Sequence, residues 1–176
     1  MKSIIVLLAM VALAAATEVS HSDFQIYGEF AVYDEASVFF PQDSIPVGEA
    51  FIEYLDIYFG DSSNTPRLRI HEAENYYPTG LELYSFNNYD VESNQVNHIV
   101  FPEPVHVTTD FCVVIEERYG NFPLIGYSEE AGPSYSFYKD QGWVRFDGYE
   151  FAVAVGFCGN PAAFEQNTWA GIKSSF

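Results

Sequence analysis

Apolar and polar residues alternate with a period of two through most of the chain after residue 16. This period is typical of β-strands that bury one face, because successive side chains on a strand point to opposite sides. Clusters of Gly, Pro, Asn and Asp separate the alternating stretches and predict turns. The expected strands span residues 24–33, 51–59, 67–70, 81–86, 96–101, 105–115, 124–127, 135–138, 143–146 and 149–157.

The stretches between these strands show no amphipathic helical pattern, which a parallel sheet would need for its crossover connections. About ten short strands with frequent turns predict an all-β fold, an antiparallel β-sandwich of jelly-roll type. We expect this sandwich to occupy residues 17–158 as a single domain, which is long enough to bury a substantial core.

The strongest local signal is the stretch WVRF-DG-YEFAV, which begins at Trp143. Asp147-Gly148 suits a two-residue type I′ turn, whose central residues need positive φ. A hairpin in this register would place Arg145 opposite Glu150 as a cross-strand ion pair.

The first sixteen residues resemble a secretory signal peptide in all three of its parts. Lys2 supplies the positive charge, residues 4–13 are apolar, and residues 14–16 form an A-x-A run. The apolar run is shorter than the roughly 20 residues that span a bilayer. We therefore expect a secreted or cell-surface protein, cleaved after Ala16 or Ala14. A buried first strand or a membrane anchor is the alternative.

The last eighteen residues, 159–176, read as a separate tail. Thr168 could cap a short C-terminal helix in which Trp169, Ile172 and Phe176 share one face. Such a tail would either cover one end of the sandwich or act as a recognition tag for export or anchoring.

Acidic residues greatly outnumber basic ones, with 25 Asp and Glu against 7 Lys and Arg and a net charge of −18. This balance argues against nucleic acid as a partner, since a binder must neutralise phosphates with Lys and Arg. It also argues against direct binding to an anionic membrane. The 16 Phe, 13 Tyr and 2 Trp indicate a collapsing chain rather than an acidic disordered one.

The two cysteines, Cys112 and Cys158, are an even number in a chain expected to be exported. This predicts a disulfide between them, worth roughly 4 kcal/mol in the chain-entropy picture. The alternative is two buried thiols that act as small hydrophobic residues. The chain has no N-glycosylation sequon, which favours a bacterial exporter.

Motifs for catalysis are missing from the sequence. It has no G-x-S-x-G elbow, and the zinc-protease-like run His71-Glu72-Ala73-Glu74-Asn75 has Asn where a second His is required. His98 and His106, on expected strands, are the histidine pair that could approach each other. We therefore expect no enzyme. Carboxylate-rich loops leave a structural calcium ion open, although no EF-hand loop is present.

Aromatic residues are the candidates for ligand contact. Tyr76, Tyr77 and Tyr119 lie in expected loops, as does Tyr89, and Trp143 lies on the charged face of the expected hairpin. Sugars stack on exposed aromatic rings and are oriented by Asn, Asp and Arg. The alternative is that these rings pack under loops or against the tail.

The spacing of residues 39–157 resembles the jelly-roll domains of bacterial secreted proteins related to the cleaved adhesin domains of gingipains. The matching stretches are Phe40-Pro41, Leu68-Arg69-Ile70-His71, Pro78-Thr79-Gly80, Pro104-Val105-His106-Val107, Phe111-Cys112-Val113-Val114-Ile115, Phe122-Pro123 and Gly142-Trp143. The chain departs from that pattern at Glu129-Glu130-Ala131-Gly132-Pro133, where the family has an Asp-Gly-Gly-Pro-like turn.

The resemblance implies a non-catalytic extracellular module for adhesion or surface interaction, with an extracellular protein or glycan as partner. The alternative function is a lectin-like carbohydrate-binding domain assisted by calcium.

Overall fold

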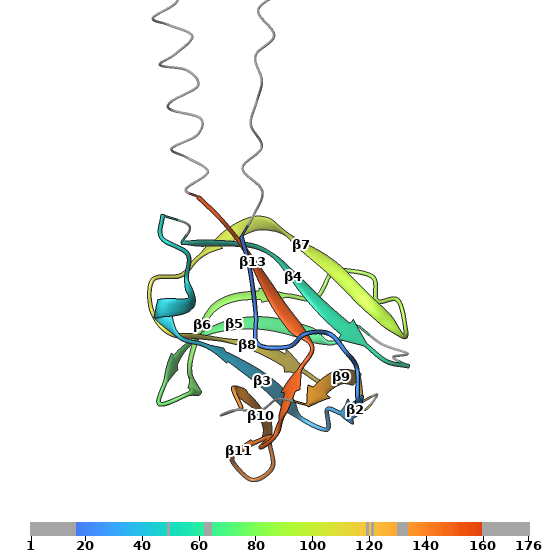
Figure 1. The fold of residues 1–176 in the computed structure, drawn as a ribbon. Helices are drawn as coiled ribbons and strands as arrows, with labels where there is room; N and C mark the ends of the chain where they lie inside the picture. Colours follow the sequence, from blue (N-terminus) through green and yellow to red (C-terminus); the bar gives the residue numbers. More distant parts are fainter. Residues whose placement is uncertain are drawn as a thin grey trace, which may run out of the picture.

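Two antiparallel β-sheets face each other and form a sandwich (Figure 1). The computed structural model describes residues 17–48, 50–61, 65–118, 120, 122–129 and 134–159. Sheet A contains β1 (Thr17–Ser20), β2 (Gly28–Ala31), β4 (Phe51–Phe59), β7 (Gln95–His106), β9 (Leu124–Glu129), β12 (Tyr149–Phe151) and β13 (Val153–Cys158). Sheet B contains β3 (Glu35–Phe40), β5 (Arg67–Glu74), β6 (Tyr77–Phe86), β8 (Phe111–Glu116), β10 (Ser136–Lys139) and β11 (Trp143–Arg145).

The predicted fold class is confirmed. From β3 to β10 most connections cross from one sheet to the other, so that β3, β5, β8 and β10 lie in sheet B while β4, β7 and β9 lie in sheet A. Such crossing connections are typical of jelly rolls. A single 3-10 turn, η1 (Gln42–Ser44), interrupts the strands, and within the described ranges no helix is long and apolar enough to cross a membrane.

The core lies between the sheets and follows the period-two pattern. In β8, Phe111, Val113 and Ile115 point into it, and their neighbours point out of the sandwich. The rings of Phe40 and Phe111 stack at 5.2 Å, and Phe157 meets Phe111 edge-on from the opposite sheet. The first contact joins the neighbouring strands β3 and β8 of sheet B, and the second packs the two sheets against each other.

Two strands of the structure, β3 and β1, were not predicted from the alternation of apolar and polar residues. β3 has the sequence EASVFF and is buried on both faces for most of its length, so it shows no alternation to detect. The edge strand β1 is only four residues long. The expected strand at 24–33 shortens to β2, because Phe24 takes a positive φ of 57° and bends the chain.

The predicted hairpin at Asp147-Gly148 is wrong. Tyr149 N–H does donate to the Phe146 carbonyl at 3.2 Å, but only Gly148 of the two central residues has positive φ. The strands on either side then separate, with β11 pairing with β10 in sheet B and β12 pairing with β9 in sheet A. The expected Arg145–Glu150 pair therefore does not form.

Glu150 instead enters the interior, where it is 2% exposed. Its carboxylate accepts the Tyr135 N–H at 2.5 Å and the Ser136 hydroxyl at 2.6 Å. Ser136 Oγ accepts the Phe151 N–H at 2.8 Å, and Ser134 Oγ donates to the Tyr149 carbonyl at 2.7 Å. We call this set of bonds the polar junction, since it joins β10 of sheet B to β12 of sheet A.

The predicted Cys112–Cys158 disulfide is also wrong. Cys112 is a free, fully buried thiol on the outer side of sheet B, whereas Cys158 follows the core residue Phe157 in sheet A. Packed sheets lie about 10 Å apart, and a disulfide needs its Cα atoms within about 7 Å. For Cys112 the alternative, a buried thiol acting as a small hydrophobic residue, describes what is observed.

Glu18 anchors the edge strand β1 to the centre of sheet A. It pairs with Gly156 of β13, beyond which Tyr54 of β4 donates its hydroxyl to Glu18 Oε2 at 3.4 Å. Gly156 is required here, because a Cβ would lie 2.1 Å from the Tyr54 ring. Partial burial, then a hydrogen bond to Asp56 and repulsion from it, raise the pKa of the Glu18 carboxyl.

We predict that Glu150→Gln lowers the free energy of unfolding by about 3 kcal/mol, because an amide group then faces donors that only a carboxylate satisfies. Urea unfolding measures the loss. Glu103→Gln, at an exposed position of β7, removes the same charge and is the matched control. Equal midpoints for the two variants would contradict the structural role of the polar junction.

We also predict that Glu18 makes stability depend on pH. A carboxyl whose pKa is raised on folding adds stability below its ordinary value of 4.5, and this stability is lost as pH rises through the raised value. In Glu18→Gln the side-chain amide can still donate a hydrogen bond to Asp56, as the protonated Glu18 carboxyl does, but the amide does not titrate. Relative to the wild type, its melting temperature should therefore improve as the pH rises above the ordinary carboxyl value of 4.5. A pH profile identical to that of Glu103→Gln would count against this interpretation.

Candidate functional site

The outer side of sheet B, facing away from sheet A, carries a second hydrophobic cluster. We call it the outer cluster, and its buried members are Phe39, Cys112, Val114 and Phe137. Tyr77, Tyr135 and Trp143 pack against its edge. Two of the four predicted ligand residues, Tyr77 and Trp143, thus lie here, and a third, Tyr76, contacts Phe39. Tyr119 lies outside the described residues.

The hairpin of β5 and β6 bends over this outer side. Asn75 and Tyr76 form its two-residue turn, both with positive φ (52° and 75°), as a type I′ turn requires. The pairing of the two strands is irregular around His71, which allows the tip to curve. Tyr77 therefore reaches Phe137 of β10 at 5.1 Å, although three strands separate β6 from β10 in the sheet.

A hollow opens beside the hairpin tip, and we call it the Tyr76 hollow. It has a volume of about 370 Å³, within the range of small-ligand sites. It is lined by Phe39, Pro41, Asp43, Asn75, Tyr76, Asp110 and Tyr135. Figure 1 shows the tip of the green hairpin near η1, which contributes Asp43.

Tyr76 is the most exposed of the predicted aromatic residues in the described part of the chain, at 47%. Its ring meets Phe39 edge-on at 5.0 Å, and the Arg145 guanidinium lies 5.7 Å from its centroid. Asp110 is held by the Gln42 N–H, which donates to its Oδ1 at 2.8 Å. The hollow thus combines a fixed aromatic ring with carboxylates, an amide and a nearby guanidinium.

Tyr77 and Trp143 are half-buried and pack on the outer cluster. Lys139 Nζ lies 6.0 Å from the Trp143 ring. Their position matches the packing alternative more closely than direct ligand contact, so Tyr76 is the stronger candidate of the three. Tyr89, the remaining aromatic residue considered, donates its hydroxyl to the Pro66 carbonyl and packs against the core.

Basic residues gather on this same side of sheet B. Arg69 contacts Glu35 at 2.6 Å, and Lys139 contacts Glu35 at 3.1 Å from the neighbouring strand. Arg67 joins Glu82 at 3.1 Å and Glu116 at 3.4 Å. These pairs link five strands of sheet B, namely β10, β3, β8, β5 and β6. Arg67 and Lys139 are about one-third exposed, so their pairs contribute little stability, whereas the Arg69–Glu35 pair is largely shielded from solvent. Together the pairs neutralise carboxylates next to the outer cluster.

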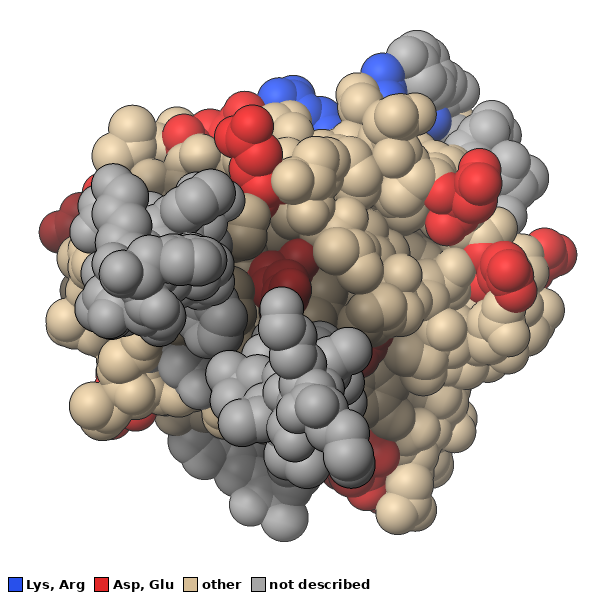
Figure 2. Space-filling model, turned by 90° about the horizontal axis from the view of Figure 1, so that it is seen from above, with Lys and Arg blue, Asp and Glu red and all other residues tan. Residues whose placement is uncertain are grey.

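Acidic side chains are otherwise spread over the surface. In the view of Figure 2 they appear on most sides, while the basic ones lie along one edge. With a net charge of −18, the chain repels anionic ligands at long range.

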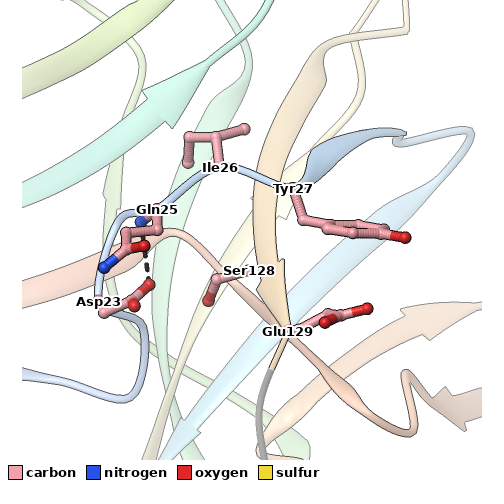
Figure 3. A pocket seen from close by; sticks show the side chains of 6 residues that line it. All are labelled: Asp23, Gln25, Ile26, Tyr27, Ser128 and Glu129. Carbon is pink, nitrogen blue, oxygen red and sulfur yellow. Dashed lines mark hydrogen bonds between the residues drawn. The ribbon is translucent and has the colours of Figure 1, made fainter.

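A second hollow of about 370 Å³ lies on the opposite sheet and is lined by Asp23, Gln25, Ile26, Tyr27, Ser128 and Glu129. Figure 3 shows Asp23 and Gln25 on one side of it, Tyr27 and Glu129 on the other, and Ser128 between them. Asp23 Oδ1 accepts the Gln25 N–H at 2.9 Å. Sequence reasoning missed this hollow, because Tyr27 reads as part of a continuous strand.

His98 and His106, the histidine pair that could have approached each other, have separate partners. His98 Nδ1 lies 2.7 Å from Asp56 Oδ1 and its ring contacts Tyr54, whereas the His106 ring packs against Phe51 in a tilted arrangement, with the centroids 4.7 Å apart. In the part of the chain that the structure describes, no group of three or more His, Cys, Asp or Glu side chains is arranged to hold a metal ion. A calcium ion stays a prediction.

Sequence reasoning did not identify Asp43, Asn75, Asp110 or Arg145 as site residues. The Asn-Tyr dipeptide between two strands was a usable turn signal for Asn75. Asp43 and Asp110 had none, since only the fold brings η1 and the start of β8 to the same hollow.

No protein-family model and no curated protein sequence matches the chain. Solved structures do share its fold. The clostridial cysteine protease Cwp84 after propeptide cleavage has a TM-score of 0.58 at 10% identity, over 83% of this chain and 41% of that one. A structure of the cysteine protease and lectin-like domains of Cwp84, a surface layer associated protein of Clostridium difficile, has a TM-score of 0.54 at 9% identity, over 75% and 34%.

The chain spans less than half the length of these solved chains, and at such identity the likeness shows the fold alone. The relationship to cleaved adhesin domains stays a prediction. What is observed is that this β-rich fold also occurs in a bacterial surface-associated protein.

Proposed function

We propose that this chain is a non-catalytic, extracellular surface-interaction module that binds glycans in the manner of a lectin. The observation that carries the proposal is the Tyr76 hollow, where an exposed aromatic ring stands next to Asp43, Asn75 and Asp110. Ring faces stack on the apolar faces of sugars, and carboxylates and amides bind their hydroxyl groups.

The hollow is also rigid, as a recognition site should be. The Tyr76 backbone is set by the two-residue turn, its ring rests on Phe39, and Asp110 is held by the Gln42 N–H. Preorganised side chains lose little conformational entropy when a ligand binds. The charge of the chain favours neutral or positively charged sugars over anionic ones.

The lectin-like domain named for one structural neighbour supports this proposal. The surface-layer association of that neighbour also supports a cell-surface or secreted location.

Adhesion to a protein is the second candidate, and a different observation favours it. Tyr33 and Phe122 are 68% and 46% exposed, yet their rings pack against each other at 4.7 Å. An exposed aromatic pair of this kind is typical of the anchors at protein interfaces.

Binding to a glycan array tests the proposal. We expect Tyr76→Ala to reduce glycan binding at least about tenfold, the loss expected from about 1.4 kcal/mol of stacking and packing. Tyr33→Ala, which removes a more exposed Tyr outside the hollow, should bind glycans as the wild type does. Repeating the array with a calcium chelator shows whether calcium assists.

Other outcomes separate the candidates. Protein adhesion would be favoured if no glycan on the array were bound and if the chain bound a cell-surface protein. That protein binding should be lost in Tyr33→Ala. Hydrolysis of any glycan would contradict the non-catalytic role.

We also propose export with removal of residues 1–16. N-terminal sequencing of the protein recovered from the medium or cell surface should begin at Thr17. An intact Met1 on protein found inside the cell would contradict the extracellular function.

A further inference from the structure

A buried histidine and a buried thiol lie side by side beneath the β5–β6 hairpin. His71 of β5 and Cys112 of β8 are directly opposite each other in the antiparallel pairing. Both are almost fully buried, at 5% and 0% exposure. Opposite residues in an antiparallel pair have Cβ atoms about 4.5–5.5 Å apart and point to the same face, so the imidazole and the sulfur share one small space.

The polar atoms in this space are poorly satisfied. Neither ring nitrogen of His71 has a hydrogen-bond partner, although both are inaccessible to solvent. The Cys112 thiol donates to the Tyr76 carbonyl at a long 3.8 Å, and a hydrogen bond with the Ser37 side chain only partly offsets the rise that burial causes in its pKa. An unsatisfied buried donor costs about 1–3 kcal/mol, so a buried imidazole of this kind needs an explanation such as a bound ion.

We propose that Cys112 Sγ and one ring nitrogen of His71 form a two-coordinate site for a soft monovalent cation, Cu(I). Thiolate and imidazole are ligands that copper prefers. On binding, the S–H bond breaks, the proton leaves to solvent, and Cu–S and Cu–N bonds form with no change in oxidation state.

Charge favours a monovalent ion here. A thiolate, a neutral imidazole and Cu(I) together carry no net charge, which suits a buried site. Zinc would leave a positive charge and would need two more ligands. Arg69, two residues before His71 on the same face, opposes added positive charge, and Glu82, which pairs with His71 on β6, is already bound to Arg67.

Burial also explains why the Cys112 thiol is unreactive as a nucleophile without a metal. It raises the pKa of Cys112 to about 12, so the group stays protonated at neutral pH. A coordinated metal removes that proton. Neither Cys112 nor His71 lines the Tyr76 hollow, and the hydrogen bond of Cys112 to Tyr76 uses the backbone carbonyl. The copper proposal therefore does not depend on the glycan proposal.

The test is an anaerobic titration of the full reduced chain with Cu(I), in competition with a chromogenic Cu(I) chelator. We expect one equivalent bound, a thiolate-to-copper absorption band, and a higher melting temperature of the wild type. Cys112→Ala should abolish binding, and His71→Phe should weaken it by at least about tenfold, the lower bound seen when even an indirect ligand partner is removed.

The second cysteine provides the matched control. Cys158→Ala should bind Cu(I) as the wild type does. Binding that persists unchanged in His71→Phe, or that disappears in Cys158→Ala, would overturn the site. A rise in the melting temperature of the wild type on adding Ag(I) tests the site without any variant, and an unchanged melting temperature would likewise overturn it.

Discussion

The burial of the Glu150 carboxylate is the constraint on which the arrangement of the C-terminal strands depends. A carboxylate in the interior is costly unless hydrogen bonds satisfy it, and the polar junction provides donors from Tyr135 and Ser136. These donors belong to sheet B, whereas Glu150 itself belongs to sheet A. The chain is thus held at the point where it leaves β11 and enters β12, and the two strands go to different sheets.

This division determines what the outer side of sheet B can carry. With β12 in the opposite sheet, β11 becomes the edge of sheet B and presents Trp143 and Arg145 beside β10. On the other side, the β5–β6 hairpin bends back across the same face. The outer cluster is enclosed between these two structures, and the Tyr76 hollow lies where the hairpin tip meets η1.

The second hydrophobic layer also explains several unusual burials. β3 and β8 are covered on both faces, which is why they lack alternation and why Cys112 and His71 lie in the interior although they point away from the main core. A sandwich with one solvated outer face would have left both side chains in water. The hairpin therefore accounts for the burial of both side chains, and the pairing of β5 with β8 accounts for their proximity.

The sequence by itself determined the fold class and most strands. β4 matches its predicted range in full, and β9 and β10 lie close to theirs, because each obeys a local rule of alternation or apolar run length. The single strand expected over residues 149–157 is divided into β12 and β13, which pair with different neighbours. Exposed Tyr76 was likewise predictable from its place between two strands. Tertiary structure alone decided the separation of β11 from β12, the distance between Cys112 and Cys158, and the meeting of Asp43, Asp110 and Tyr76. The physical reason is that local patterns specify which face of a strand is apolar but not which sheet will cover it, and these features depend on that choice.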